Sequence, residues 1–295
     1  MHPRHVALAL LVVLIWGVNF AIIQLGLRQV SPLALGVARF VFAAFPWVFF
    51  VRRPDVPWRL ILLYSLLIFA GQFGLLFTGM KVGMSAGLAS LILQLQVFFT
   101  IGLSVLLLGE KPTAWQVAGA LLAFGGIAVV AANVGGDATL PGLLLVILAA
   151  LSWGGGNVAS RKVTTHSPSA DPLALVVWGS LFAIPPLVAA ALLLDPAGTA
   201  ASFVQPDWVS IGSVAYIVYL STLFGYAVWS RLLSQYPVAA VVPFTLLVPV
   251  FGFLGSAVLL GEPIQAWKIG AGLLVIAGLC VNLFGRRLFA RRAAA

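Results

Sequence analysis

The chain contains 295 residues, of which 62% are hydrophobic and only 8% are charged, and its mean hydropathy is +1.13. Soluble domains carry about 25% charged residues, so this composition excludes a soluble protein and predicts an integral membrane protein. The net charge of +9 does not indicate a nucleic-acid partner. The basic residues lie in short connections and at the C-terminus, where they orient a membrane protein.

Ten apolar runs follow one another along the chain, separated by polar residues or proline. Each has about the 20 residues that a helix needs to cross a bilayer, whereas barrel strands would have about 10. The first run lacks a small-residue cleavage site, so we expect an uncleaved helix rather than a signal peptide. The predicted spanning helices are 6–27, 33–51, 58–80, 85–108, 114–133, 141–161, 172–194, 208–233, 238–260 and 266–285.

The basic residues of the connections set the orientation of these helices. With the N-terminus in the cytoplasm, the inside segments hold twelve Lys or Arg residues and the outside segments hold three. Positive charge stays on the cytoplasmic side. We therefore expect a multi-pass protein of the cell inner membrane with both termini in the cytoplasm.

One phrase occurs in each half of the chain, first as "LLLGEKPTAW" and later as "VLLGEPIQAW". The glutamates of the two copies, Glu110 and Glu262, are 152 residues apart. Five spans separate them, and an odd number of spans reverses direction. The sequence thus predicts two inverted five-helix repeats, 1–137 and 138–295, which is the architecture of many secondary transporters with a central cavity.

Several fragments resemble a known family: "LIWGVNF", "SPLALGVARF", "LQLQVFFTIGLSVLLLGEKPT", "SWGGGNV" and "LVPVFGFLGSAVLLGEP". They resemble the EamA family of the drug/metabolite transporter superfamily, and within it the bacterial exporters of amino acids and metabolites of the EamA and YddG type. The resemblance covers essentially the whole chain. It implies an all-α bundle of ten helices around a central cavity, lined mainly by helices 1, 3, 4, 6, 8 and 9. It also implies that rocking of the halves exposes the cavity to each side in turn.

Polar and aromatic side chains at membrane depth are the candidates for substrate binding, because such groups normally face the bundle interior or a water-filled path. Amides can hold a zwitterion without trapping it, while aromatic walls accept varied side chains. The alternative for each is packing or hydrogen bonding between helices. The candidates are Trp16, Asn19, Tyr64, Gln72, Phe73, Phe77, Gln94, Gln96, Trp153, Asn157, Tyr216 and Tyr219.

Within this set, spacing separates some residues and groups others. Gln94 and Gln96 point some 200° apart on a helix, so only one of them is expected to face the cavity. Tyr216, Tyr219 and Tyr226 are three and seven residues apart, which predicts one stripe on a helix. That stripe is expected to form a cavity wall, with aromatic packing as the alternative.

Arg39 is the one charged residue well inside a predicted span. Its side chain could extend to the headgroups, hold helix 2 against a neighbour, or meet a substrate carboxylate. Prolines and glycines mark candidate hinges or gates, namely Pro243, Pro249, Gly79 and Gly83. Proline removes a backbone hydrogen bond, but close helix packing explains the glycines equally well.

All seven acidic residues fall in connections or at helix ends. Without a buried carboxylate, a simple proton relay is unsupported, and facilitated export is an equal alternative. We expect Glu110 and Glu262 to cap the helices that follow them.

Other function classes lack their signatures. The phosphate-loop pattern of an ATP-driven pump is absent, and no catalytic set lies at membrane depth, so we expect neither an enzyme nor a cofactor. The three histidines lie outside the spans and the single cysteine lies within one, so no metal site is expected. The loops give no sign of an obligatory protein partner. The prediction is export of neutral amino acids or related small metabolites; carriers of sugar phosphates, nucleotide sugars or drugs, and a membrane-embedded enzyme, are the alternatives.

Overall fold

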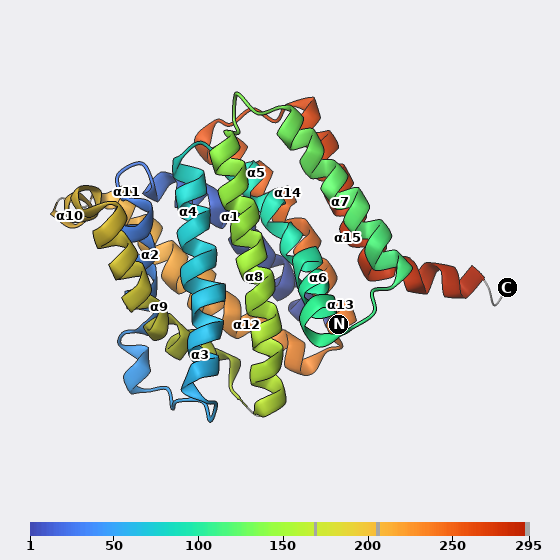
Figure 1. Cartoon of the computed structure of the whole chain (residues 1–295), viewed down its shortest axis with the longest axis horizontal. Coiled ribbons are helices and arrows are strands. Elements are labelled where there is room, and N and C mark those ends of the chain that lie inside the picture. The colour runs from blue at the N-terminus through green and yellow to red at the C-terminus, as the bar shows by residue number, and fades with distance from the viewer. Residues whose placement is uncertain (168–169, 205–206, 293–295) are drawn as a thin grey trace.

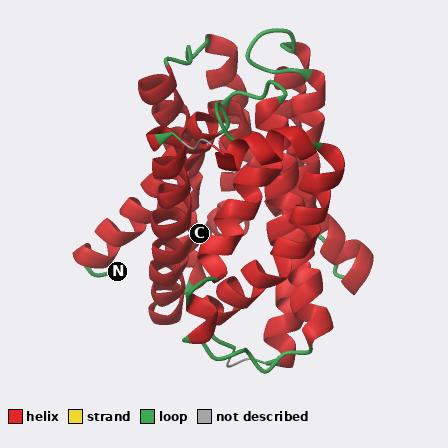
Figure 2. Ribbon diagram, turned by 90° about the vertical axis from the view of Figure 1, so that its left-hand side faces the viewer, coloured by secondary structure: helices red, strands yellow, loops and turns green. Residues whose placement is uncertain are grey.

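A computed structural model describes residues 1–167, 170–204 and 207–292, and ten helical segments of this part are long and apolar enough to cross a membrane. Figures 1 and 2 show them as one bundle of roughly aligned helices. The prediction of an all-α membrane protein with ten spanning helices is confirmed. The predicted ends agree to within a few residues, except that the sixth span runs on from residue 161 to His166 and the tenth continues to Arg292.

The first five spans are α1 (Pro3–Gly26); α2 (Pro32–Ala44) with a 3-10 turn at Trp47–Phe49; α3 (Trp58–Ser65), a π-helical segment (Leu66–Gly71) and α4 (Gln72–Lys81); α5 (Ala86–Ile92), a 3-10 segment (Leu93–Leu95) and α6 (Gln96–Leu108); and α7 (Ala114–Ala132).

The other five spans are α8 (Leu140–His166); α9 (Pro172–Leu194), which is followed by the short helix α10 (Pro196–Val204); α11 (Trp208–Ala215), a π-helical segment (Tyr216–Phe224) and α12 (Gly225–Gln235); α13 (Val238–Val241), a 3-10 segment (Val242–Leu247) and α14 (Val248–Leu260); and α15 (Ala266–Arg292).

Irregular helix occurs at corresponding places in the two halves. The third span of each half contains a π-helical segment, and the fourth contains a 3-10 segment. Both departures from the α-helix are often associated with functional sites. Pro243 lies within the second 3-10 segment and Pro249 at the start of α14, where each removes a backbone donor. The ninth span is therefore interrupted at its prolines, and a hinge role for them stays a prediction.

Helix ends follow from local sequence. Gly109 and Gly261 end α6 and α14 in the left-handed conformation, with φ of 69° and 71°, which glycine adopts without steric cost. Thr113 caps α7, and its side chain and that of Gln116 form a reciprocal capping box. This result corrects the prediction for Glu110, because Thr113 takes the capping role at α7.

The packing between the halves has an exchange pattern. α1 packs against α14 and α6 against α8, which pairs span 1 with span 9 and span 4 with span 6. α2 packs against α9, and α7 against α15. If the two halves were exchanged, the pairing of spans 1 and 9 would become that of spans 6 and 4, and the reverse. The pairings of spans 2 and 7 and of spans 5 and 10 would each be reproduced.

The α7–α15 pair lies at one edge of the bundle (Figure 1) and is held by close backbone contact. A Cβ atom at Gly119 would lie 2.5 Å from the carbonyl oxygen of Gly278, and one at Gly278 would clash with the carbonyl oxygen of Gly119. Gly126 meets the carbonyl oxygen of Ala271 in the same way, at 2.8 Å. Small residues allow such crossings in membranes, where dispersion contacts drive helix association.

Candidate functional site

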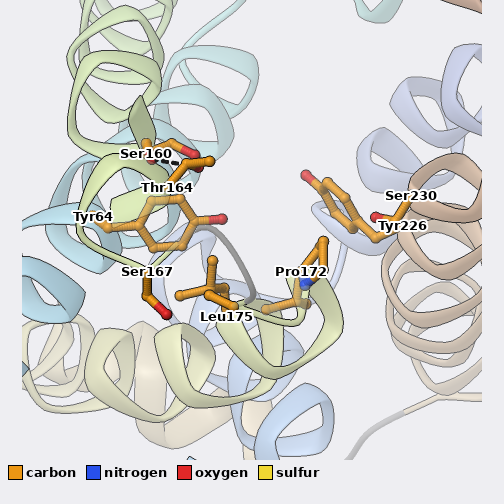
Figure 3. Close-up of a pocket in the computed structure, with 10 residues that line it drawn as sticks. Tyr64, Ser160, Thr164, Ser167, Pro172, Leu175, Tyr226 and Ser230 are labelled. Atoms are coloured by element: carbon orange, nitrogen blue, oxygen red, sulfur yellow. Dashed lines mark hydrogen bonds between the residues drawn. The ribbon is translucent and has the colours of Figure 1, made fainter. Parts of the chain in front are cut away.

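A cavity of about 260 Å³ lies among the third, sixth, seventh and eighth spans (Figure 3). It occupies the end of the bundle that carries the termini, because the eighth span ends where the first begins: the Tyr236 hydroxyl lies 2.7 Å from Nδ1 of His5. The lining residues are Tyr64, Ser160, Thr164, Ser167, Ala170, Pro172, Leu175, Val176, Tyr226 and Ser230.

Hydroxyl groups dominate the polar surface of this cavity. Those of Tyr64 and Tyr226 face one another from opposite walls (Figure 3). Thr164 donates to the backbone carbonyl of Ser160 at 3.1 Å, across one turn of α8. None of the ten lining residues is charged. The volume is slightly below the roughly 300–1,000 Å³ of clefts that hold drug-sized ligands, so the cavity fits a small polar molecule.

Arg39 of α2 is buried inside the bundle, with 2% of its surface exposed. Its Nη2 donates to Oγ1 of Thr222 at 3.0 Å, and the guanidinium carbon lies 3.7 Å from the ring centroid of Phe73. Its Nε and Nη1 have no hydrogen-bond partner. The side chain therefore points into the protein, and the alternative that it extends to the headgroups is wrong.

Tyr226 connects the cavity to a group of buried aromatic and charged side chains. It lines the cavity, and it lies one turn after Thr222, which accepts a hydrogen bond from Arg39. The Trp16 ring lies 5.7 Å from Tyr226 and 5.2 Å from Trp229, and its Nε1 donates to the carbonyl of Ser221 at 2.9 Å. Trp16 thus supports the wall that carries Tyr226 rather than lining the cavity itself.

The predicted tyrosine stripe is wrong. The Tyr216 hydroxyl donates to the carbonyl of Ile15 at 3.0 Å, Tyr219 is 47% exposed, and Tyr226 lines the cavity. The cause is the π-helical segment Tyr216–Phe224, whose wider turn changes the angle between residues three and seven apart.

The two asparagines at related positions differ in their surroundings. Nδ2 of Asn157 donates to Oε1 of Gln96 at 2.7 Å and to Oγ1 of Thr100 at 3.0 Å, which connects α8 to α6. Asn19 is buried, and its Oδ1 has no hydrogen-bond partner. Asn157 and Gln96 therefore form hydrogen bonds between helices, which was the alternative to substrate binding. Asn19 instead has an acceptor without a partner.

The remaining candidates are placed between helices and do not line the cavity. Nε2 of Gln94 donates to the carbonyl of Thr245 at 3.3 Å, which connects the 3-10 segments of spans 4 and 9. The rings of Phe73 and Phe77 pack at a tilt in the core, with their centroids 5.6 Å apart. Gln72 is buried and Trp153 packs, partly buried, against the core; neither lines the cavity.

The candidate hinge glycines lie in close contacts. A Cβ atom at Gly79 would lie 2.9 Å from Cγ2 of Val146, and Gly83 has φ of +118° in the turn after α4. Gly79 is therefore explained by close helix packing rather than by a hinge. Gly83 is explained by its positive φ, which favours glycine at that turn.

The cavity also contains residues that the sequence reasoning missed: Ser160, Thr164, Ser167 and Ser230. Ser160 and Thr164 are four residues apart and share one face of α8. This four-residue spacing of hydroxyl residues near the end of a span is the sequence pattern that could have identified them as cavity residues.

The end of the bundle away from the termini is closed by a group of contacts around Glu262. Its Oε1 accepts from the backbone N–H of Ala86 at 3.0 Å and its Oε2 from that of Gly87 at 3.4 Å. A Cβ atom at Gly87 would lie 2.5 Å from Cδ1 of Phe253, so α5 and α14 are in close contact. Glu262 therefore caps the fourth span, and the prediction that it caps the helix after it is wrong.

An ion pair between a buried lysine and a partly exposed aspartate reinforces this closed end. Nζ of Lys268 lies 2.6 Å from Oδ2 of Asp137 and donates to the carbonyl of Pro263 at 2.9 Å, and its side chain is 2% exposed. The connection that carries Asp137 also forms an isolated β-bridge from Ala138 to Met84. Removing Asp137 would leave the buried charge of Lys268 without its counter-ion, which is strongly destabilising.

At the end that carries the termini, Glu110 instead pairs with Arg161 at 2.7 Å on the surface. The hydrogen bond from the Arg161 guanidinium lowers the pKa of the Glu110 carboxyl. Among the described residues, α6 and α13 do not pack together as α5 and α14 do. The two ends of the bundle are therefore in different states.

A bundle of ten apolar helices, with a polar cavity near one end and the opposite end closed, defines a multi-pass membrane transporter. The sequence model of the EamA-like transporter family matches residues 4–132 and 140–284, so the chain belongs to this family.

Individual proteins are similar over the whole chain. A probable amino-acid metabolite efflux pump of Salmonella typhimurium is 43% identical, over 95% of both chains. One of Escherichia coli is 41% identical, over 97% of both chains. A probable terminal-alkyne amino-acid exporter of Streptantibioticus cattleyicolor is 28% identical over 96% of this chain and 93% of its own. The crystal structure of a protein that is 19% identical to this chain aligns with it over 100% of both proteins, with a TM-score of 0.65, which shows a shared fold.

Proposed function

We propose that this EamA-like transporter exports neutral amino acids or closely related small metabolites across the cell inner membrane. Its two five-helix halves, 1–137 and 138–295, are inserted in opposite directions, and both termini are cytoplasmic. The chain has no enzymatic activity of its own. The observation that carries the proposal is the uncharged, hydroxyl-lined cavity at the end with the termini, opposite the closed contact of Glu262.

The chemistry of the cavity favours this cargo over the alternatives. A sugar phosphate would need several basic side chains and a cationic drug an acidic one, and none of the ten lining residues is charged. The efflux pumps of Salmonella typhimurium and Escherichia coli are named for amino-acid metabolites, and at 41–43% identity they support the same class of cargo here.

The asymmetry of the bundle supports alternating access. With the termini in the cytoplasm, the cavity lies at the inner end and the Glu262 contacts close the outer end, as expected before cargo is released outside. Rocking of one half against the other around a fixed site is the usual mechanism of inverted-repeat transporters. The interrupted fourth and ninth spans, with Pro243 and Pro249, are the proposed hinges.

The test is transport by the purified protein in liposomes. Labelled neutral amino acids, a sugar phosphate and a cationic dye are offered, each with and without a pH gradient. We expect saturable entry of amino acids only, with no requirement for the gradient because no acidic residue lies within a span. Entry of only the dye or the sugar phosphate would overturn the choice of cargo.

Point variants connect transport to this cavity. Tyr64→Phe and Tyr226→Phe remove the two facing hydroxyls, and we expect the apparent affinity to fall several-fold, in line with about 0.5–1.5 kcal/mol per hydrogen bond. Tyr219→Phe is the matched control, because Tyr219 is on the same span as Tyr226, exposed, and outside the cavity. Equal effects of all three changes would show that this cavity does not bind the cargo.

A further inference from the structure

Arg39 is a buried cation without a counter-ion. The structure gives it one hydrogen bond, to Thr222, and the face of Phe73, while Nε and Nη1 lack acceptors. The two salt bridges among the described residues are those of Arg161 and Lys268. All seven acidic residues of the chain lie outside the spans, so no carboxylate of the protein is placed to neutralise it.

Burying a guanidinium in this way is costly, because a charge removed from water needs a partner of opposite charge or a full set of hydrogen bonds. An aromatic face and one hydroxyl compensate only in part. The planar guanidinium carries its donors in a fixed arrangement that matches a carboxylate. The vacant donors therefore fit an anion that is supplied from outside the protein.

The cavity approaches this cation along span 8. Tyr226 lines the cavity, and Thr222, which accepts from Arg39, lies one turn earlier on the same span. A carboxylate bound between Tyr226 and Arg39 would accept from the vacant N–H groups, and the Tyr226 hydroxyl would donate to its second oxygen; Arg39 and Thr222 lie behind the residues that line the cavity. Phe73 forms the apolar base under the guanidinium.

We infer that Arg39, with Tyr226, forms a subsite for the carboxylate of the cargo, and that this carboxylate rather than the amino group is the required element. The inference rests on the proposed function and defines its substrate class. An ammonium group meets no acidic side chain within the spans. The cargo class is therefore small monocarboxylates, of which neutral amino acids are one kind.

The first experiment compares four ligands in liposomes that contain the full-length protein. Uptake of labelled L-leucine and L-serine is measured in competition with the methyl ester, the amide and the N-acetyl derivative of the same amino acid. The ester and the amide are expected to compete at least about ten-fold more weakly, because they leave the buried donors unpaired. The N-acetyl derivative is expected to stay within about three-fold of the parent. Weak competition by the N-acetyl derivative, or strong competition by the amide, would overturn the inference.

Variants then assign the effect to Arg39. Arg39→Gln should abolish the preference for acid over amide, and Arg39→Lys should keep part of it, since a lysine has the charge without the planar donor set. Arg28→Gln, an exposed change in the first connection, is the control. A full preference in Arg39→Gln would exclude the subsite.

Thr222→Val separates binding from packing. It removes the bond that joins Arg39 to span 8 but leaves the guanidinium in place. If Arg39 only holds the two helices together, Thr222→Val will lose transport as Arg39→Gln does; the carboxylate subsite instead predicts that it keeps the acid-over-amide preference. Should Arg39→Gln not fold, Thr222→Val and Arg39→Lys still decide the question.

Failure of the proposed function has a different result. If the wild-type protein takes up neither labelled amino acid, the function fails, and the subsite is then tested by thermal stabilisation of the detergent-solubilised protein with L-leucine, leucinamide and N-acetyl-leucine. Stabilisation by both acids but not by the amide keeps the subsite. No difference among the three removes it.

Discussion

Glu110 and Glu262 stand at equivalent positions, 152 residues apart, yet they bind different partners. Each follows a glycine in the left-handed conformation that ends a spanning helix. Glu262 accepts hydrogen bonds from the first backbone N–H groups of α5, whereas Glu110 pairs with Arg161 on the surface. The two copies of the motif therefore make different contacts because one end of the bundle is closed and the other is not.

Removing the Glu262 carboxylate should loosen the closed end. A side-chain cap of a helix start contributes about 0.5–2 kcal/mol, which corresponds to a change of about 2- to 30-fold in a two-state equilibrium. In a Cys280→Ala background with Ala86→Cys, we expect Glu262→Ala to raise the rate of labelling by an impermeant thiol reagent added outside. Glu110→Ala should not raise this rate. Equal rates in all variants would show that Glu262 does not hold the end closed.

The crossing of α7 and α15 predicts a sharp difference between two neighbouring glycines. Gly119→Ala places a methyl group 2.5 Å from a backbone carbonyl, while Gly125 on the same helix has nothing within 4 Å of its Cβ position. Overpacking costs about 1–3 kcal/mol, so Gly119→Ala should unfold several degrees lower in a thermal melt in detergent. Gly125→Ala should match the wild type. A Gly119→Ala protein as stable as the control would mean that the helices separate at no cost.

Asn19 and Asn157 should separate in their effects on transport and stability. Asn157→Ala removes bonds between α8 and α6, and polar contacts between membrane helices contribute about 0.6 kcal/mol on average, with a maximum near 1.7. It should lower the melting temperature with little effect on the apparent affinity. Asn19→Ala removes an acceptor that has no partner, so it should weaken uptake without loss of stability. The reverse result would exchange their roles.

The pKa of Glu110 predicts the pH range in which its ion pair with Arg161 persists. Arg161 lowers this pKa, so the pair is fully formed above the ordinary pKa of a glutamate, near 4.3, and is lost only as the pH falls through the lower value. Uptake should therefore show no transition from this pair between pH 6 and 8, and Arg161→Gln should leave the shape of the pH profile unchanged. A wild-type step in that range that Arg161→Gln abolishes would contradict this assignment.

The ten helices could be predicted from sequence because the length of an apolar run is a local property, and the bilayer fixes how long it must be. The αL glycines before Glu110 and Glu262 are local in the same sense. The site was less predictable. Tyr216, Tyr219 and Tyr226 were grouped by an α-helical period that the π-helical segment does not keep. Glu262 was assigned to the next helix, but its partner is α5, 175 residues away in the chain. Contacts between residues so far apart in the chain produce no periodic pattern in the sequence from which they could be predicted.

The exchange pattern of the packing has a consequence for how such a chain can be made. In the inverted arrangement that we propose, the pairings α1–α14 and α6–α8 are counterparts of one another, and α2–α9 and α7–α15 are each their own counterpart, so each half carries both surfaces of these contacts. Two copies of one ancestral half, inserted in opposite directions, would offer each other the surfaces that α1, α6, α8 and α14 now share. On this proposal the chain corresponds to a fused antiparallel dimer. Gly135 and Gly136, whose Cβ positions meet nothing within 4 Å, lie in the connection between the two halves.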